Sequence, residues 1–245
     1  MDCKTTQTTK VLSSQTDFNA SVGLIESCQF FQDNMCEFFY NIKCDGVRLV
    51  PACHAFWAIT KNKIRFLDDV RWLDEIDITT NLCKLSGVRL NLSSKIECSG
   101  KPKMVCLQEL CAMDSDTRKL RLVNTIPQFP CDIESKEAYS DIQFDKLNFE
   151  LTDNLVGEVK VNSTNIDFFG HTNNIEYVKM MYSIFPSSEI KKIKPREFEI
   201  HYLKESKEGD TLGIYRKIEE NQVLFEIKKD NETLVKAKLI FDRLI

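Results

Sequence analysis

The sequence predicts an α+β protein built from two copies of one unit, each with a long helix packed on an antiparallel β-sheet. Three observations lead to this prediction. Two helical patterns are each followed by about four strand-like segments, short turn signals separate those segments, and short strings match at equivalent places in the two halves. Strands joined by short turns favour antiparallel pairing, and an element order that recurs indicates a duplication.

The first half begins with a short strand and turn, expected over 10–18, and a helix, expected over 22–40. Within the helix, apolar residues recur at spacings of three and four, as on the buried face of a helix. They are Leu24, Cys28, Phe31, Met35 and Phe38. Segments rich in Ile, Val, Leu, Phe and Thr then predict strands at 54–67, 75–85, 88–98 and 104–114.

The second half repeats this order after a connecting segment. Residues 124–154 hold Pro127, Pro130 and many charges without periodicity, which indicates a linker. A strand is expected over 156–166, a helix over 172–185, and strands at 196–204, 211–219, 222–228 and 233–242. The expected organisation is a first repeat over 1–123, a linker over 124–154 and a second repeat over 155–245.

Short matches support the duplication. Thr16-Asp17-Phe18 precedes the first helix as Ile166-Asp167-Phe168 precedes the second, and Phe66-Leu67-Asp68-Asp69 resembles Tyr202-Leu203-Lys204-Glu205. A long helix packed on a curved antiparallel sheet is the hotdog arrangement, and two such units usually pair side by side. The expected fold is therefore a tandem hotdog, with two long helices packed on one continuous antiparallel sheet.

Composition excludes several classes of protein. The formal charge of −4 lacks the basic excess of a nucleic-acid binder. No apolar run is long enough for a transmembrane helix, and the N-terminus lacks the apolar core of a signal peptide. The 10 cysteines all precede residue 132 and form no CxxC pair, so we expect reduced thiols in the cytoplasm and no structural zinc site.

A polar cluster over 165–174 marks the expected start of the second helix. His171 is one of three histidines in the chain, and Asp167 lies four residues before it. A helix N-terminus offers unpaired N–H groups that can hold a developing oxyanion. The same residues also fit a purely structural interpretation, in which Asp167, Thr172 or Asn173 caps the helix and Gly170 permits the turn.

A string in this turn resembles the signature of the acyl-acyl carrier protein thioesterases of plants and bacteria, a double-hotdog family: Asp167-x-x-Gly170-His171-x-Asn173-Asn174-x-x-Tyr177. The family pattern is Asp-x-Asn-x-His-x-Asn-Asn, followed further on by a catalytic Glu in a Tyr-x-x-Glu context, which Glu205 fills here. Two positions depart from it. Phe169 replaces the middle Asn, and Ser206 stands where many plant members have a cysteine.

The resemblance implies thioester hydrolysis without a metal or cofactor. Glu205, helped by His171, would activate water, and Asp167 would orient the histidine or the turn. Asn173, Asn174 and Phe169 would contact the substrate, with N–H groups near Asn173 facing the thioester oxygen. Ser206 could replace the cysteine chemically, although a structural role for it is the simpler interpretation.

The implied partner is an acyl carrier protein that holds its acyl chain on a phosphopantetheine arm, and a homodimer is compatible with the resemblance. The apolar face of the first helix, with Phe30, Phe31, Phe38 and Phe39, would line an acyl tunnel or simply form the core. The basic run 191–196 would dock the acidic carrier or be a solvated loop.

Three functions remain open from the sequence. They are hydrolysis of acyl-carrier thioesters in fatty acid biosynthesis, hydrolysis of acyl-CoA by the same residues, and non-catalytic acyl binding. Retention of Asp167, His171 and Glu205 favours an enzyme, whereas Phe169 favours the binding protein.

Overall fold

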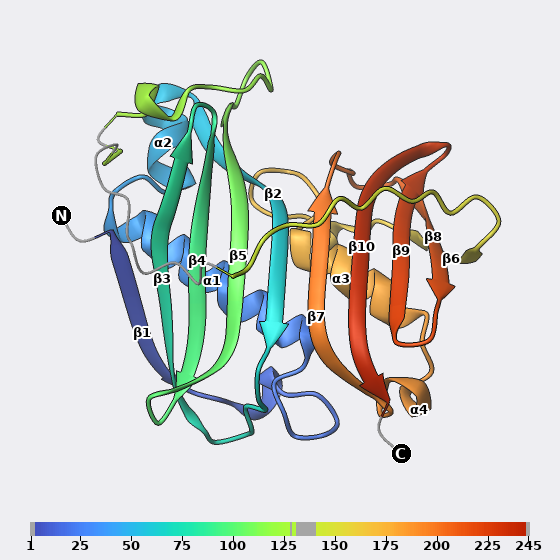
Figure 1. The fold of residues 1–245 in the computed structure, drawn as a ribbon. Coiled ribbons are helices and arrows are strands. Elements are labelled where there is room, and N and C mark those ends of the chain that lie inside the picture. The colour runs from blue at the N-terminus through green and yellow to red at the C-terminus, as the bar shows by residue number, and fades with distance from the viewer. Residues whose placement is uncertain (1–2, 128, 131–140, 244–245) are drawn as a thin grey trace. The chain divides into compact units, whose positions relative to one another are not determined.

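The computed structural model describes residues 3–127, 129–130 and 141–243, and it divides the chain into the units Met1–Gln143 and Phe144–Ile245. Each unit consists of an antiparallel sheet with a helix across one face (Figure 1). Residues 131–140 of the expected linker lie outside the described residues.

The first unit has a five-stranded sheet in the order β1-β3-β4-β5-β2. Its elements are β1 (Lys4–Lys10), α1 (Leu24–Asn41), α2 (Gly46–Cys53), β2 (Ala55–Phe66), β3 (Glu75–Ser86), β4 (Arg89–Cys98) and β5 (Lys101–Asp114). All five apolar residues expected on the inner face of α1 are buried. They pack toward β-strand residues such as Ile64, Ile78 and Leu92, which are fully or almost fully buried, and this contact forms the core of the unit.

The second unit has a five-stranded sheet in the matching order β6-β8-β9-β10-β7. Its elements are β6 (Leu155–Lys160), α3 (Asn174–Ser183), α4 (Ser187–Ile190), β7 (Ile193–Tyr202), β8 (Thr211–Ile218), β9 (Gln222–Lys229) and β10 (Glu232–Arg243). Ile175 and Val178 on α3 are buried, as the helical pattern predicted.

Several expectations about element ends were wrong. The first strand ends at Lys10, earlier than expected, and the turn expected within 10–18 includes a 3-10 helix at Ser13–Gln15. Helices α2 and α4 were not expected. The second helix has 10 residues against 18 in α1, so only α1 is long. Pro186 limits α3, because a proline disfavours helical geometry in the residue before it.

The two units use the same main-chain hydrogen bonds at matched positions. The N–H groups of Val11 and Val161 each donate to the carbonyl of an aspartate, Asp74 and Asp210, over 2.9 Å. The Val22 N–H donates to the Val70 carbonyl, and in the second unit the Thr172 N–H donates to the Ser206 carbonyl. In the same way, the Leu67 N–H donates to the Lys103 carbonyl, and the Leu203 N–H donates to the Leu234 carbonyl. These pairs align Ser21 with His171 and Asp69 with Glu205, so any residue of one unit can be compared with its counterpart.

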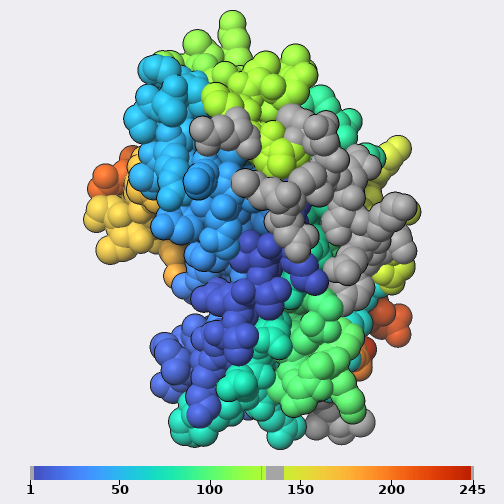
Figure 2. Space-filling view, turned by 90° about the vertical axis from the view of Figure 1, so that its left-hand side faces the viewer, coloured from blue at the N-terminus to red at the C-terminus, as the bar shows by residue number. Residues whose placement is uncertain are grey.

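Helix α2 and the segment after β5 lie side by side at one end of the first unit (Figures 1 and 2). The Ser115 N–H donates to the His54 carbonyl over 2.9 Å, and the Arg121 guanidinium contacts the Cys53 carbonyl. These contacts explain why a short helix is stable where the sequence shows no long apolar period.

An extended segment, residues 144–151, crosses the sheet of the second unit on the face opposite α3 (Figure 1). We call it the strap. Charged side chains of the sheet hold its main chain: Glu226 accepts from the Leu151 N–H over 3.0 Å, Lys228 donates to the Leu151 carbonyl over 3.1 Å, and Lys236 contacts the Phe149 carbonyl. Glu226 is fully buried and pairs with both lysines, so the strap covers a charged surface of the sheet.

None of the helices in the described ranges reaches the length and apolar character that a membrane span requires.

Candidate active site

The turn before α3 is closed by its own backbone and by Asp167. The Asp167 N–H donates to the His171 carbonyl over 2.8 Å, and the Gly170 N–H donates to the Asp167 carbonyl over 3.0 Å. One Asp167 carboxylate oxygen accepts from the N–H groups of Phe169 and His171, over 2.9 and 3.3 Å. Gly170 takes a φ of 81°, which favours glycine. Asp167 therefore holds the backbone of the turn.

His171 and Glu205 meet although they lie on different segments. The imidazole Nε2 is 3.3 Å from a Glu205 carboxylate oxygen. The His171 side chain is largely buried, at 15% exposure, whereas Glu205 is 45% exposed and reaches solvent. A carboxylate next to an imidazole, with access to water, can work as a general base.

The main chain that carries Glu205 is fastened to the turn beside it. The Thr172 N–H donates to the Ser206 carbonyl over 3.0 Å, directly after His171 on one side and Glu205 on the other. The Ser206 N–H donates to the hydroxyl oxygen of Tyr177 over 2.9 Å. The separation of His171 from Glu205 is thus set by main-chain contacts.

The Ser206 hydroxyl is part of a buried network. It lies 2.7 Å from the Thr172 hydroxyl and 2.8 Å from the Tyr177 hydroxyl, and Ser206 is fully buried. Burial raises the pKa of Tyr177, so its hydroxyl stays protonated and can donate to Ser206. The sequence pattern contained Tyr177 but could not show that Thr172 and Ser206 complete this network.

Asn173 caps helix α3. Its side-chain oxygen accepts from the Ile175 N–H over 3.0 Å, and its own N–H donates to the Asn165 carbonyl over 2.9 Å. The Asn173 N–H is therefore already used, so among the N–H groups near Asn173 that were expected to face the thioester oxygen, this one is not available. Within the described part of the chain, the Asn174 N–H has no acceptor, and it lies in the first turn of the helix.

Phe169 places an aromatic ring where the family pattern has an amide. Its ring centroid is 4.2 Å from that of Phe168, which is 75% exposed. In the first unit, Asn19 occupies the matched position, and its N–H donates to Asp17 over 2.8 Å just as Phe169 donates to Asp167. The fold of the turn is thus kept in both units, while the His–Glu pair occurs only in the second.

The basic run 191–196 is not a loop throughout. Only Lys191 and Lys192 precede β7, and residues from Ile193 onward belong to that strand. Arg196 is paired with Asp242 on the adjacent strand β10.

The nine described cysteines are all free thiols. Burial raises the pKa of the thiols of Cys28 and Cys106. Cys36 lies at an exposed position of α1, and partial burial of its thiol together with the nearby carboxylates of Asp33 and Asp45 raises its pKa to about 11. Thiols with raised pKa values are poor nucleophiles at neutral pH, and the buried Cys28 and Cys106 have packing roles.

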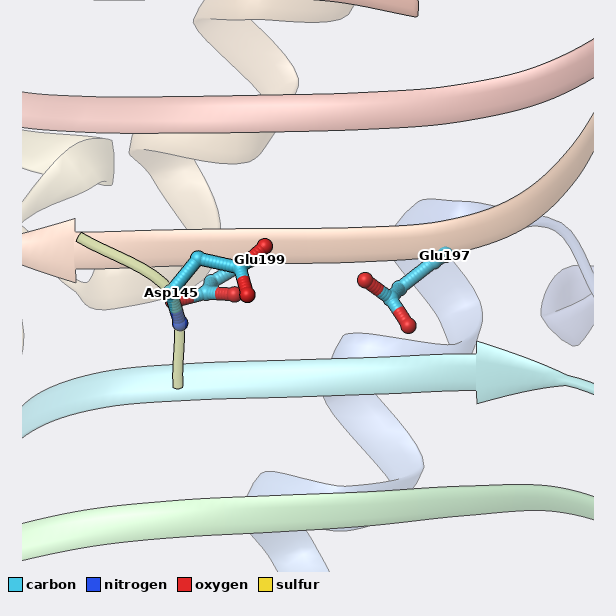
Figure 3. A group of neighbouring side chains, drawn as sticks. All are labelled: Asp145, Glu197 and Glu199. Atoms are coloured by element: carbon cyan, nitrogen blue, oxygen red, sulfur yellow. The ribbon is translucent and has the colours of Figure 1, made fainter. Parts of the chain in front are cut away.

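A second group of carboxylates was not expected from the sequence. Oxygens of Asp145, Glu197 and Glu199 lie within 4.8 Å of one another, which is a spacing that a metal ion could bridge (Figure 3). Glu199 already accepts from the Asp145 N–H over 2.9 Å and lies 2.7 Å from His201 Nε2, and Asp145 contacts Lys238. Lys238, His201 and the main chain of the strap therefore already contact two of these three carboxylates.

Both units have the helix-on-sheet form of hotdog-type proteins. Residues 150–243 match the family model of the acyl-ACP thioesterase C-terminal domain, which confirms the resemblance for the unit that carries His171 and Glu205. The search of curated proteins returned no match to this chain.

Solved structures show the same fold over the whole chain. An acyl-ACP thioesterase from Bacteroides thetaiotaomicron superposes with a TM-score of 0.84 at 20% identity, covering 98% of both chains. A 12:0-ACP thioesterase from Umbellularia californica also has a TM-score of 0.84, at 14% identity, covering 100% of this chain and 99% of the other.

Proposed function

We propose that this chain is a tandem-hotdog thioester hydrolase that releases fatty acid from acyl-acyl carrier protein in the cytoplasm. The observation that carries the proposal is the 3.3 Å contact between His171 and Glu205 beside the N-terminus of α3, inside the segment that matches the family. The matched element order and hydrogen bonds of the two units support the tandem hotdog. Free thiols are typical of a reducing compartment.

The reaction uses water as the nucleophile. Glu205 takes a proton from a water molecule at its exposed side, and His171 positions and supports the carboxylate. The water oxygen forms a bond to the thioester carbon, and the carbon–sulfur bond then breaks. The phosphopantetheine thiolate leaves and takes up a proton, so the products are a free acid and the thiol of the carrier. Each step uses side chains and water, and the proposed mechanism is therefore metal-independent.

The helix N-terminus stabilises the negative charge that forms on the thioester oxygen. The Asn174 N–H is the donor we assign to this role, because it lacks an acceptor in the described part of the chain and lies at the positive end of α3. Asn173 caps the helix and so fixes the direction of its first N–H groups. Asp167 accepts from the His171 N–H and so holds His171 in place beside the helix N-terminus. The Phe169 ring lies against Phe168 beside this turn and offers the acyl group an apolar contact.

Ser206 is a positioning residue in this mechanism. Its hydroxyl is fully buried and engaged by Thr172 and Tyr177, and no general base faces it among the contacts of that network. A serine nucleophile needs such a base within hydrogen-bond reach.

Acyl-CoA is the second candidate substrate, because CoA and acyl carrier proteins present the same phosphopantetheine arm. Non-catalytic acyl binding is the third candidate. Phe169 is the observation that favours it, since phenylalanine cannot supply the hydrogen bond of the amide it replaces.

Hydrolysis assays with the purified full chain separate these three. The enzyme should release thiol from an acyl-carrier substrate, with a higher kcat/KM than from the matching acyl-CoA. His171→Ala and Glu205→Gln should each lower kcat by roughly a hundredfold or more. Ser21→Ala and Asp69→Asn, at the matched positions of the first unit, are the controls and should leave the rate unchanged. Equal losses in all four variants would place the site elsewhere, and absence of hydrolysis on both substrates would leave acyl binding.

A further inference from the structure

A tyrosine hydroxyl at the end of β7 contacts the first turn of α3. Tyr202 is the last residue of β7, and its hydroxyl donates to the Asn174 carbonyl over 3.3 Å. Asn174 is the first residue of α3. A carbonyl oxygen has two lone pairs, so it can accept this bond together with the bond that a helix makes to the fourth residue along the chain. The contact can therefore form without opening the helix.

This contact joins the two sides of the candidate site. Asn174 carries the N–H that we assign to the thioester oxygen, whereas Tyr202 stands three residues before Glu205, the proposed general base. Helical geometry fixes the direction of the Asn174 N–H relative to the carbonyl of the same residue. A hydroxyl that holds this carbonyl therefore also holds the N–H in place relative to the segment that carries the base.

Other contacts between the same two segments follow Glu205 in the chain. The Thr172 N–H donates to the Ser206 carbonyl, and the Ser206 N–H donates to the Tyr177 hydroxyl. The segment is thus joined to the turn and helix of α3 both before and after Glu205, which limits the movement of the carboxylate relative to the helix N-terminus. Such control matters because reacting groups must be held within about 0.5 Å of their productive positions.

The first unit has the same fold without this hydroxyl. By the main-chain alignment, Phe66 occupies the position of Tyr202, and both rings are half-buried. Val22 and Val70 stand where the second unit has the threonine and the serine of its hydroxyl network. The helix-on-sheet fold therefore does not require hydroxyl groups at these three positions. They occur in the unit that has the His–Glu pair, which indicates a role in the site.

We propose that Tyr202 is a positioning residue for the N–H of Asn174 that binds the developing oxyanion. This inference rests on the proposed thioesterase function and adds a residue to its site. The Tyr202 hydroxyl acts through the Asn174 carbonyl and exchanges no proton with the substrate. It keeps the N–H directed at the thioester oxygen as negative charge forms there, so its effect belongs to the transition state and not to substrate binding.

Removal of the hydroxyl alone tests this role. Tyr202→Phe keeps the ring and introduces the residue that the first unit has at the matched position. The assay uses the full-length protein and the acyl-carrier thioester that the parent hydrolyses fastest. We expect kcat to fall roughly tenfold. KM and the pH at which kcat is half-maximal should stay the same, and Tm should fall by less than about 6 °C. Tyr215→Phe on β8 is the matched control and should leave kcat and KM unchanged.

A second variant tests the route through Asn174. Asn174→Pro removes the N–H at the first helical position, where proline is well tolerated, and the backbone of Asn173, with a φ of −59° and a ψ of 138°, suits a following proline. This variant should lower kcat by about a hundredfold or more. Adding Tyr202→Phe to Asn174→Pro should lower kcat by less than about twofold further, because the group that Tyr202 positions is already gone.

The outcomes separate this inference from the proposed function. An unchanged kcat in Tyr202→Phe, or losses that multiply in the double variant, overturns the inference and leaves hydrolysis by His171 and Glu205 standing. A shifted pH profile in Tyr202→Phe also overturns it, since Tyr202 would then act on a group that transfers a proton. A parent that hydrolyses neither acyl-carrier nor acyl-CoA thioesters contradicts the proposed function, and the inference falls with it.

Discussion

Replacing Ser206 by alanine separates a positioning role from a catalytic one. The change removes the 2.7 Å contact with Thr172 and the 2.8 Å contact with the Tyr177 hydroxyl, while the Ser206 N–H still donates to Tyr177. Each lost hydrogen bond contributes about 0.5–1.5 kcal/mol. The free energy of unfolding should therefore fall by roughly 1–3 kcal/mol, which lowers Tm by about 2–12 °C for a chain of this size.

The Ser206→Ala protein should keep most of its hydrolytic activity. Glu205 keeps its main-chain anchor, because the Ser206 carbonyl still accepts from the Thr172 N–H. We expect kcat within about tenfold of the parent, whereas loss of a true serine nucleophile costs on the order of a millionfold. Steady-state kinetics and thermal melting on the same preparation measure both effects. Ser188→Ala, which removes an exposed serine from α4, should alter neither. A Ser206→Ala protein with an unchanged Tm and no activity would refute the positioning role.

Three further changes test other parts of the second unit. Phe169→Asn restores the amide of the family pattern and should raise kcat by up to about a hundredfold, or roughly 2.7 kcal/mol, measured as thiol release. Glu226→Ala leaves Lys228 buried without its carboxylate and should destabilise the protein by about 3–5 kcal/mol in chemical denaturation. A hydrogen bond from Lys229 lowers the pKa of the Asp210 carboxyl in the folded protein. The ionised carboxylate therefore stabilises the fold above about pH 4, and this stabilisation is lost as the pH falls through the lowered pKa. Asp210→Asn should therefore cost less than about 1 kcal/mol at pH 6, and the difference from the parent should vanish in acid.

The controls for these changes come from the same chain. Asn19→Phe reproduces the Phe169 departure in the first unit and should leave hydrolysis unchanged. Glu232→Ala removes an exposed partner of Lys204 and should alter stability by less than about 0.5 kcal/mol. A slower Asn19→Phe enzyme would show that the first turn takes part in the reaction.

Periodicity predicted most elements of this fold. The spacing of Leu24, Cys28, Phe31, Met35 and Phe38 placed α1 within two residues of its observed ends, because one apolar face dominates that segment. Periodicity did not predict α2, because eight residues are too few to show a helical period. The helix begins at the cap Asp45, whose side chain accepts from the Arg48 N–H over 3.1 Å. So short a helix depends on tertiary contacts more than on its own pattern.

The candidate site was predictable only as a set of residues. The motif named His171 and Glu205, and the structure brings them within 3.3 Å. It did not show that Asp167 accepts from backbone N–H groups, or that Ser206 is enclosed by hydroxyls. Those facts depend on side-chain rotamers and on segments distant in sequence.

The charged side chains of the sheet bind the strap mainly through its main-chain groups. Lys228 and Glu226 bind the carbonyl and the N–H of Leu151, and both groups occur in almost every amino acid. The exposed positions Asn148 and Glu150 can therefore drift freely over evolutionary time. The number of residues in the strap is constrained. Deleting one residue would move the buried Leu147 or Leu151 out of its site and would present the wrong main-chain groups to Glu226 and Lys228. Selection on this segment should appear in alignments as conserved length, with apolar residues kept at positions 147 and 151 and variable residues at 148 and 150.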